Sequence, residues 1–210
     1  MIETVVKQNT QGLSASYKMF TVDNCVWGSA EIPFNAIGGK ISCVIPENTQ
    51  VLMEYQRKSG IRYYELQLFG KSIGYIKQVW RKGSLFKPGF EYHRVFWEGK
   101  EYNIYPIGMG KEGIYYPCYE RDNNGNELQQ VGLIHKPGIV HDLKDQYTCF
   151  AEKKEVMNFL MLYVIYTDIW DYRDTGEMAI KSTKAKYVVS RNKELLSKYT
   201  PNYLKKSHSG

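Results

Sequence analysis

The chain has 210 residues, of which 43% are hydrophobic and 24% are charged, an ordinary balance for a folded soluble protein. Its four cysteines, at positions 25, 43, 118 and 149, form no CxxC pair, which excludes a disulfide-built scaffold and indicates reduced thiols. The first eight residues contain no apolar segment typical of a secretory signal. We therefore expect a cytoplasmic location, including one at the periphery of a membrane.

The net charge of +6 is unevenly distributed. Residues 173–210 hold nine Lys/Arg and three Asp/Glu, so this segment accounts for the whole excess, and residues 1–172 are neutral. Such asymmetry favours an anionic membrane surface, an acidic protein partner or a nucleic acid, the last being the weaker expectation. The alternative is a basic extension that only increases solubility.

The pattern along the chain predicts many short strands. Residues 1–13 are polar and are expected to be a flexible lead-in, and residues 23–40 are expected to be irregular because they contain Pro33 and a glycine pair. Elsewhere, alternation of apolar and polar residues between turn signals predicts an antiparallel sandwich or barrel. The expected strands are 14–22, 41–45, 50–57, 61–69, 73–80, 91–97, 101–106, 113–120, 128–134 and 146–150.

One helix is predicted over residues 152–172. Residues 156–170 are nearly all large and apolar, and Asn158, Thr167 and Asp168 do not share a helical face. A helix that is apolar on all sides is buried in protein. Its apolar part is shorter than the roughly 20 residues of a membrane span, so burial is favoured over insertion in a bilayer. A strand over 186–190 and a short helix over 191–198 are expected in the basic extension, residues 177–210.

This order of elements resembles the tubby-like superfamily, which includes tubby C-terminal domains, phospholipid scramblases and LURP-one-related proteins. The resemblance is carried by the hairpins from 50 to 134, the strand 146–150 and the helix 156–170. It implies a mainly β domain over residues 14–176, a closed antiparallel barrel of about twelve strands around one buried hydrophobic helix near the C-terminus. It also implies a non-enzymatic protein, because tubby domains bind phosphoinositide headgroups through Lys and Arg. The extension after the helix departs from the family pattern.

Several motifs suggest chemistry but fit a structural role better. Gly70-Lys71-Ser72 lacks the earlier glycine and the helix of a phosphate-binding loop, and 122–127 lacks the glycine and glutamate of a calcium loop, so both predict hairpin turns. His93, His135 and His141 show no metal-binding spacing. We expect no cofactor or metal. An enzyme remains the alternative, with a site at the barrel mouth that uses Asp168 or a cysteine such as Cys118 or Cys149.

Two basic segments are the candidate binding sites. Cations lie beside aromatic residues between positions 75 and 90, a combination that suits a bilayer interface as well as nucleic-acid bases. The basic extension supplies further cations. The sequence therefore predicts a non-enzymatic protein that binds anionic lipid headgroups or a protein partner, with a nucleic-acid-binding module as a further alternative. The candidate residues are Lys77, Arg81, Lys82, Lys87, Lys181, Lys184, Lys186 and Arg191.

Overall fold

The computed structural model describes residues 1–10, 14–33, 40–138, 144–172, 189, 192–200 and 203. These residues form one antiparallel sheet, one long helix and short helical turns. The strands are β1 (Ile2–Thr10), β2 (Ala15–Thr21), β3 (Val26–Ile32), β4 (Lys40–Ile45), β5 (Thr49–Lys58), β6 (Ile61–Leu68), β7 (Lys71–Arg81), β8 (Phe90–Trp97), β9 (Lys100–Ile104), β10 (Ile107–Gly108), β11 (Ile114–Arg121), β12 (Glu127–Lys136) and β13 (Gln146–Ala151).

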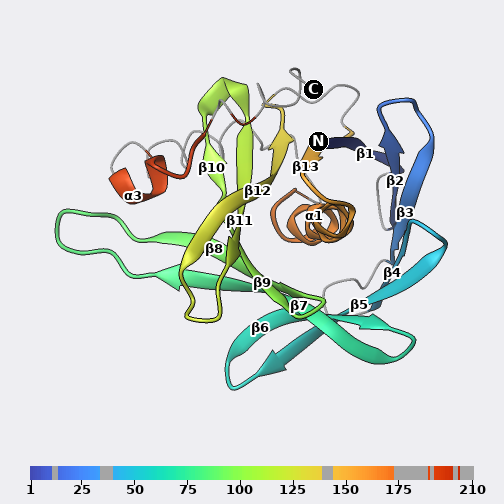
Figure 1. Cartoon of the computed structure of the whole chain (residues 1–210), viewed down its shortest axis with the longest axis horizontal. Helices are drawn as coiled ribbons and strands as arrows, with labels where there is room; N and C mark the ends of the chain where they lie inside the picture. The colour runs from blue at the N-terminus through green and yellow to red at the C-terminus, as the bar shows by residue number, and fades with distance from the viewer. Residues whose placement is uncertain are drawn as a thin grey trace.

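The sheet closes on itself. Successive strands pair in order from β1 to β9, β1 also pairs with β13, and the ring is completed through β12 and β11, which pairs with β9. In the described part of the chain this gives a closed barrel of twelve antiparallel strands, with the two-residue β10 attached to β11. Figure 1 shows the ring end-on, with the helix at its centre. The predicted fold class is confirmed.

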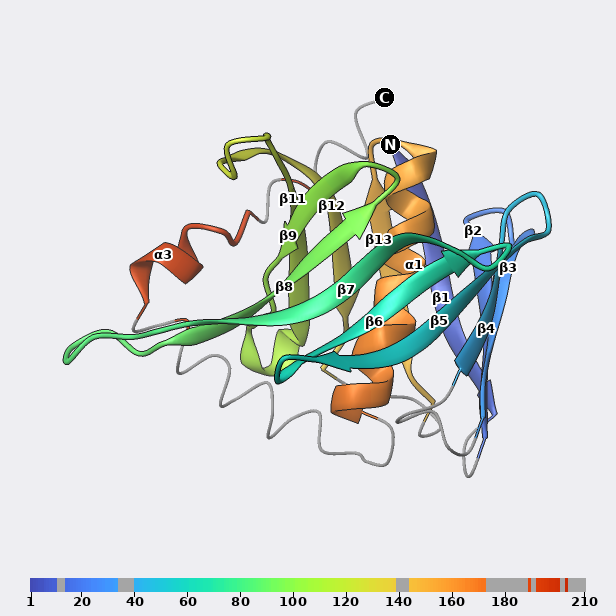
Figure 2. The same ribbon diagram turned by 90° about the horizontal axis from the view of Figure 1, so that it is seen from below.

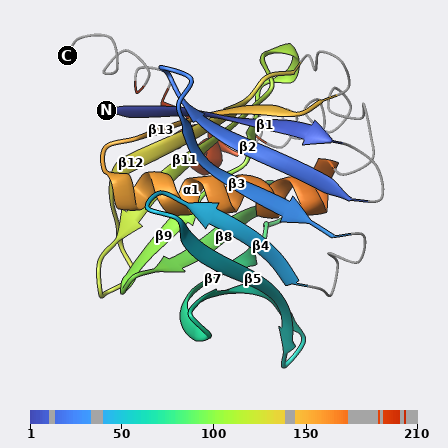
Figure 3. The ribbon, with the colours of Figure 1, turned by 90° about the vertical axis from the view of Figure 1, so that its right-hand side faces the viewer.

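The helix occupies the lumen of the barrel, as predicted. It consists of α1 (Lys154–Thr167), which continues as a π-helical segment, η2 (Asp168–Tyr172). Every α1 residue from Phe159 to Thr167 is buried, and Figure 3 shows the helix running along the inside of the strands. No helix among the described residues is both long and apolar enough to cross a membrane.

The helix packs closely against the barrel wall. The Phe159 ring lies 4.4 Å from that of Tyr102 on β9. At Gly132 on β12, an added Cβ would lie 2.7 Å from a methyl group of Leu160, so a glycine lets the helix approach the strand. Burial of about a dozen large side chains, at ~1.5–3 kcal/mol each, makes this helix the largest block of the core.

The expected flexible lead-in is wrong for most of its length. Residues 2–10 form β1, which pairs with both β2 and β13 and is needed to close the ring. The lumen-facing positions of β1 are Thr4, Val6 and Gln8, so the segment looks polar in sequence. The Thr4 hydroxyl donates to the sulfur of Met157, and the Gln8 side chain accepts from the Asp145 backbone, which allows the polar residues to be buried.

The expected irregular segment 23–40 also contains a strand, β3. Its lumen-facing residues include Gly28 and Ala30, whose small side chains give a weak hydrophobic signal. The backbone carbonyl of Val44 lies 2.3 Å from where a Cβ of Gly28 would be, so close packing of β3 on β4 requires the small residue. Near the other end of the chain, α3 (Lys193–Leu196) falls within the short helix expected over 191–198.

Candidate functional site

The most exposed apolar side chains lie at the tip of the β7–β8 hairpin. This hairpin projects well beyond the barrel wall, as Figure 2 shows. Leu85 and Phe86 in its turn are 90% and 92% exposed, and Trp80 near the end of β7 is 62% exposed. Adjacent apolar side chains that are this exposed mark an interaction surface more often than a packing defect.

The turn that carries these side chains is well defined. The backbone N–H of Ser84 donates to the carbonyl of Lys87 over 2.8 Å, and the N–H of Lys87 donates back to Ser84 over 3.2 Å. A Cβ added to Gly83 would lie 2.3 Å from the Lys87 carbonyl oxygen, so the glycine allows the two arms of the loop to come together. The loop therefore presents Leu85 and Phe86 from a closed turn.

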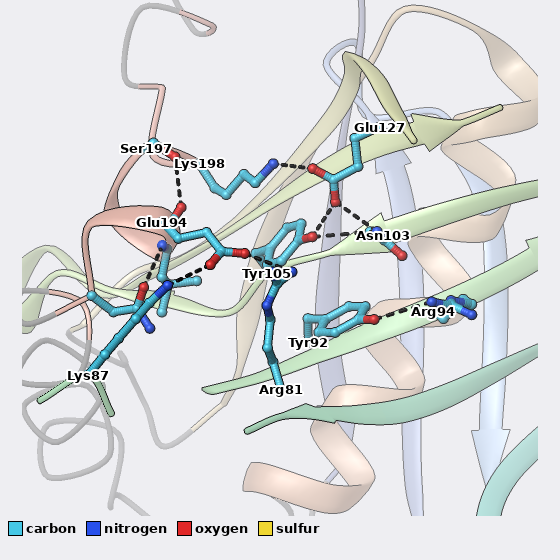
Figure 4. Close-up of polar contacts among 12 residues, drawn as sticks. Arg81, Lys87, Tyr92, Arg94, Asn103, Tyr105, Glu127, Glu194, Ser197 and Lys198 are labelled. Carbon is cyan, nitrogen blue, oxygen red and sulfur yellow. Dashed lines mark hydrogen bonds and ion pairs between the residues drawn. The ribbon is translucent and has the colours of Figure 1, made fainter. Parts of the chain in front are cut away.

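Three of the predicted basic residues surround this tip. Arg81 Nη1 lies 2.8 Å from one carboxylate oxygen of Glu194, and Lys87 Nζ lies 2.7 Å from the other. Figure 4 shows both cations converging on this carboxylate. Lys82 is exposed and makes no ion pair within the described residues. The tip of the hairpin thus carries three cations, of which two share one counter-charge.

Glu194 is held in place by the docking of α3 on the hairpin. Asn192 caps α3 by accepting the backbone N–H of Leu195, and its amide donates to the carbonyl of Pro88 over 2.9 Å. The Leu195 side chain is buried against Phe90 and its neighbours on the outside of the barrel. The described part of the extension therefore packs on the barrel.

The remaining predicted basic residues are not at the tip. Lys77 lies further along β7, with Nζ 4.8 Å from the centre of the Tyr75 ring. Partial burial, followed by the nearby Arg94 guanidinium, lowers the pKa of Lys77. The other four predicted residues, Lys181, Lys184, Lys186 and Arg191, lie outside the described residues, as does the strand expected over 186–190 apart from Val189.

Asp168 is buried at the C-terminal end of the helix and pairs with a lysine on a strand. Lys136 Nζ lies 2.8 Å from Asp145 and 3.6 Å from Asp168. Tyr147 donates its hydroxyl to Asp168 over 2.6 Å and accepts from Lys136 over 2.8 Å, and the Tyr17 hydroxyl also donates to Asp168. The Asp168 carboxylate therefore has both hydrogen-bond donors and a counter-charge inside the barrel.

The electrostatics of this cluster reflect burial. Desolvation, opposed by the charge of Lys136, raises the pKa of Asp145 to about 7. Burial likewise lowers the pKa of Lys136 and, together with Asp168, raises the pKa of Tyr17 and Tyr147. Because each group binds another member of the cluster, the arrangement anchors the helix to β2, β12 and β13.

His93 lies on the opposite wall at the same end of the barrel. Its Nδ1 lies 2.7 Å from the Tyr163 hydroxyl and its Nε2 lies 3.1 Å from Glu91, so both ring nitrogens are engaged. The imidazole borders a hollow of about 120 Å³ that Trp170 and Arg62 also line. His93 is thus a buried histidine whose ring is held by hydrogen bonds.

The described cysteines offer no activated nucleophile in the lumen. Cys43, Cys118 and Cys149 are buried, and burial raises the pKa of each thiol, which opposes thiolate formation. In the described residues, no group of three or more His, Cys, Asp or Glu is placed to hold a metal ion. The 122–126 segment is the predicted hairpin turn, since the backbone N–H of Asn126 donates to the Asp122 carboxylate over 2.7 Å.

Comparison with known proteins adds no match to this geometry. The chain matches no protein-family model, and neither the curated proteins nor the solved structures give a match. Sequence reasoning located the basic hairpin but missed Leu85 and the docking of Glu194. The available signal for an exposed tip was the apolar pair Leu85-Phe86 between Gly83 and Pro88.

Proposed function

We propose that this protein is a non-enzymatic, tubby-like barrel that associates with anionic membrane surfaces through the tip of its β7–β8 hairpin. The observation that carries the proposal is the pair Leu85 and Phe86, about nine-tenths exposed and bordered by Arg81, Lys82 and Lys87. Apolar side chains can enter the headgroup region while the adjacent cations meet anionic lipids. The proposed family membership rests on the apolar helix enclosed by antiparallel strands.

The tip alone predicts weak, reversible binding. Partial insertion of Leu85 and Phe86 contributes about 1.5 kcal/mol each. The three cations at the tip and Glu194 leave a net charge of +2, and each net charge contributes about 1 kcal/mol. The total of about 5 kcal/mol corresponds to a partition coefficient on the order of 10³–10⁴ M⁻¹, comparable to a single acyl anchor. Stable association needs a second signal, and the cations of the basic extension are the proposed source.

Vesicle co-sedimentation at low and high salt tests the proposal. The protein should bind vesicles of phosphatidylcholine with phosphatidylserine, and binding should fall with salt because the cations are exposed. The double variant Leu85→Ala/Phe86→Ala should bind about 100-fold more weakly, from the loss of about 3 kcal/mol.

Phe69→Ala is the matched control. Phe69 is 88% exposed, but it lies in the turn that precedes β7, and the length of this strand, roughly 33 Å at the rise of a strand, separates it from the tip. If Phe69→Ala weakens binding as much as the double variant, or if phosphatidylserine does not improve binding at low salt, the proposal fails. Vesicles with phosphoinositide at matched charge distinguish headgroup recognition from surface charge.

A further inference from the structure

A trough runs over the outer face of β6 and β7, apart from the tip of the β7–β8 hairpin. It has a volume of about 390 Å³, within the range of roughly 300–1,000 Å³ for small-molecule sites. Figure 2 shows these strands in front of α1, on the outside of the barrel. The lining includes Ile61, Tyr63 and Glu65 of β6, and Tyr75 and Lys77 of β7. The outer side of the sheet therefore forms the trough, and the filled lumen takes no part in it.

Two cations face each other on this surface without a carboxylate partner. Lys77 on β7 lies directly opposite Arg94 on β8 in the antiparallel ladder. Their neighbours Ile76 and Val95 belong to the core inside the barrel, so both cations project outward. Neither cation forms an ion pair within the part of the chain that the structure describes, although Arg94 donates to the Tyr92 hydroxyl over 3.2 Å.

The two cations repel each other, because like charges directly opposite on neighbouring strands destabilise a sheet. Partial burial, and then the Arg94 guanidinium, lower the pKa of Lys77. Glu101 is near enough to oppose this shift, but its carboxylate is already paired with Arg121 on the same outer face. An anion that bridged Lys77 and Arg94 would relieve the repulsion, as Glu101 does for Arg121.

Aromatic and aliphatic side chains form the apolar part of the trough. The Tyr75 ring stacks on Phe96 with their centres 5.8 Å apart, and it meets the Tyr63 ring edge-on at 6.5 Å. The Tyr75 hydroxyl donates to Glu101 over 3.1 Å, which fixes the ring. Ile61, which is 53% exposed, extends this surface. A fixed surface of this kind suits the planar ring of a ligand.

Glu65 gives the trough a hydrogen-bond acceptor. It lies two residues along β6 from Tyr63, about 7 Å further on at the rise of a strand. One of its carboxylate oxygens accepts from the Gln67 amide over 2.9 Å. A carboxylate has room for several donors, so Glu65 can also accept from hydroxyl groups of a ligand.

The trough thus combines a cation pair, a flat apolar surface and a carboxylate acceptor. These groups match the phosphate, the base and the ribose of a nucleotide. We propose that the trough binds a single nucleotide, with its phosphate between Lys77 and Arg94, its base against Tyr63 and Ile61, and its ribose hydroxyls toward Glu65.

A single nucleotide fits this surface better than a nucleic-acid strand. Surfaces that bind strands offer several rings to successive bases along a positively charged groove. Here the Tyr75 ring is already in contact with Phe96 and with the ammonium of Lys77. The volume of the trough also suits one small molecule.

Calorimetric titration with adenosine monophosphate (AMP), adenosine and inorganic phosphate at low salt tests the inference. AMP should bind with a Kd below about 1 mM, and adenosine and phosphate should each bind at least about tenfold more weakly, because each lacks part of the ligand. Lys77→Met and Arg94→Met should each weaken AMP about tenfold, through the loss of a charged phosphate contact. Tyr63→Leu should weaken AMP several-fold and leave the affinity for phosphate unchanged.

Lys71→Met, an exposed change at the start of β7, is the control for net charge and should bind AMP like the parent protein. Lys77→Met should melt near the temperature of the parent, because it removes the repulsion with Arg94, so its loss of binding would not reflect unfolding. Should Arg94→Met unfold, the Lys77 and Tyr63 variants still decide.

Four outcomes would overturn the inference. The parent protein fails to bind AMP, inorganic phosphate binds as tightly as AMP, or Lys71→Met loses as much affinity as Lys77→Met. The fourth is a pentanucleotide of adenylate that binds more than about tenfold more tightly than AMP, which would assign the surface to a strand.

Discussion

The buried lysine at the C-terminal mouth gives the sharpest test of how the helix is held. Lys136 has no exposed surface, and its ammonium contacts Asp145, Asp168 and Tyr147. Lys136→Met keeps an unbranched side chain of similar length and removes the charge. Asp145 and Asp168 are then left without their shared cation inside the barrel.

The expected loss of stability follows from the groups that remain. Removing one member of a buried ion pair costs about 3–5 kcal/mol because the other charge stays buried. Asp168 keeps the hydroxyls of Tyr17 and Tyr147 as donors, so we expect the lower end of this range, about 3 kcal/mol. With a urea m value of about 2–3 kcal/mol/M, the unfolding midpoint should fall by about 1–1.5 M.

Urea unfolding followed by circular dichroism measures this change. Lys58→Met, at the exposed β5–β6 turn, is the matched control and should stay within about 0.5 kcal/mol of the parent. The double variant Lys136→Met/Asp168→Asn should lose less than the sum of its single variants, because it also removes one stranded charge. A Lys136→Met protein as stable as the parent would refute the view that this cluster anchors the helix.

Three further outcomes are expected. Glu194→Gln should raise the affinity for anionic vesicles several-fold in co-sedimentation, because it removes the shared counter-charge of Arg81 and Lys87 and so adds one net positive charge at the tip, worth about 1 kcal/mol. The raised pKa of Asp145, about 7 against 3.8, means that the folded state holds the proton more tightly than the unfolded state. Stability should therefore fall as pH rises from about 4 to 7, by at most about 1.4 kcal/mol per unit, and Asp145→Asn should remove this fall in urea unfolding at different pH values. Gly74→Ala should cost at least about 2 kcal/mol in thermal unfolding, because its Cβ would lie 2.1 Å from the Phe96 carbonyl oxygen.

The barrel and its helix could be predicted because their signals are local. Alternation over 61–69 predicts β6, and the absence of a polar face over 156–170 predicts a buried helix. β1 could not be recognised, because its lumen-facing Thr4 and Gln8 are polar and find their partners on α1 and beside β13. Burial of such residues depends on contacts far away in the sequence.

The candidate site was predictable only in outline. Cations beside aromatics indicated the hairpin, but the pairing of Arg81 and Lys87 with Glu194 joins positions more than a hundred residues apart. Lys136, the partner of Asp168, was not identified from the sequence. It is the last residue of β12, whereas the predicted strand ended at residue 134. Charge in a sequence shows how many ions are present, whereas the fold decides which of them are neutralised.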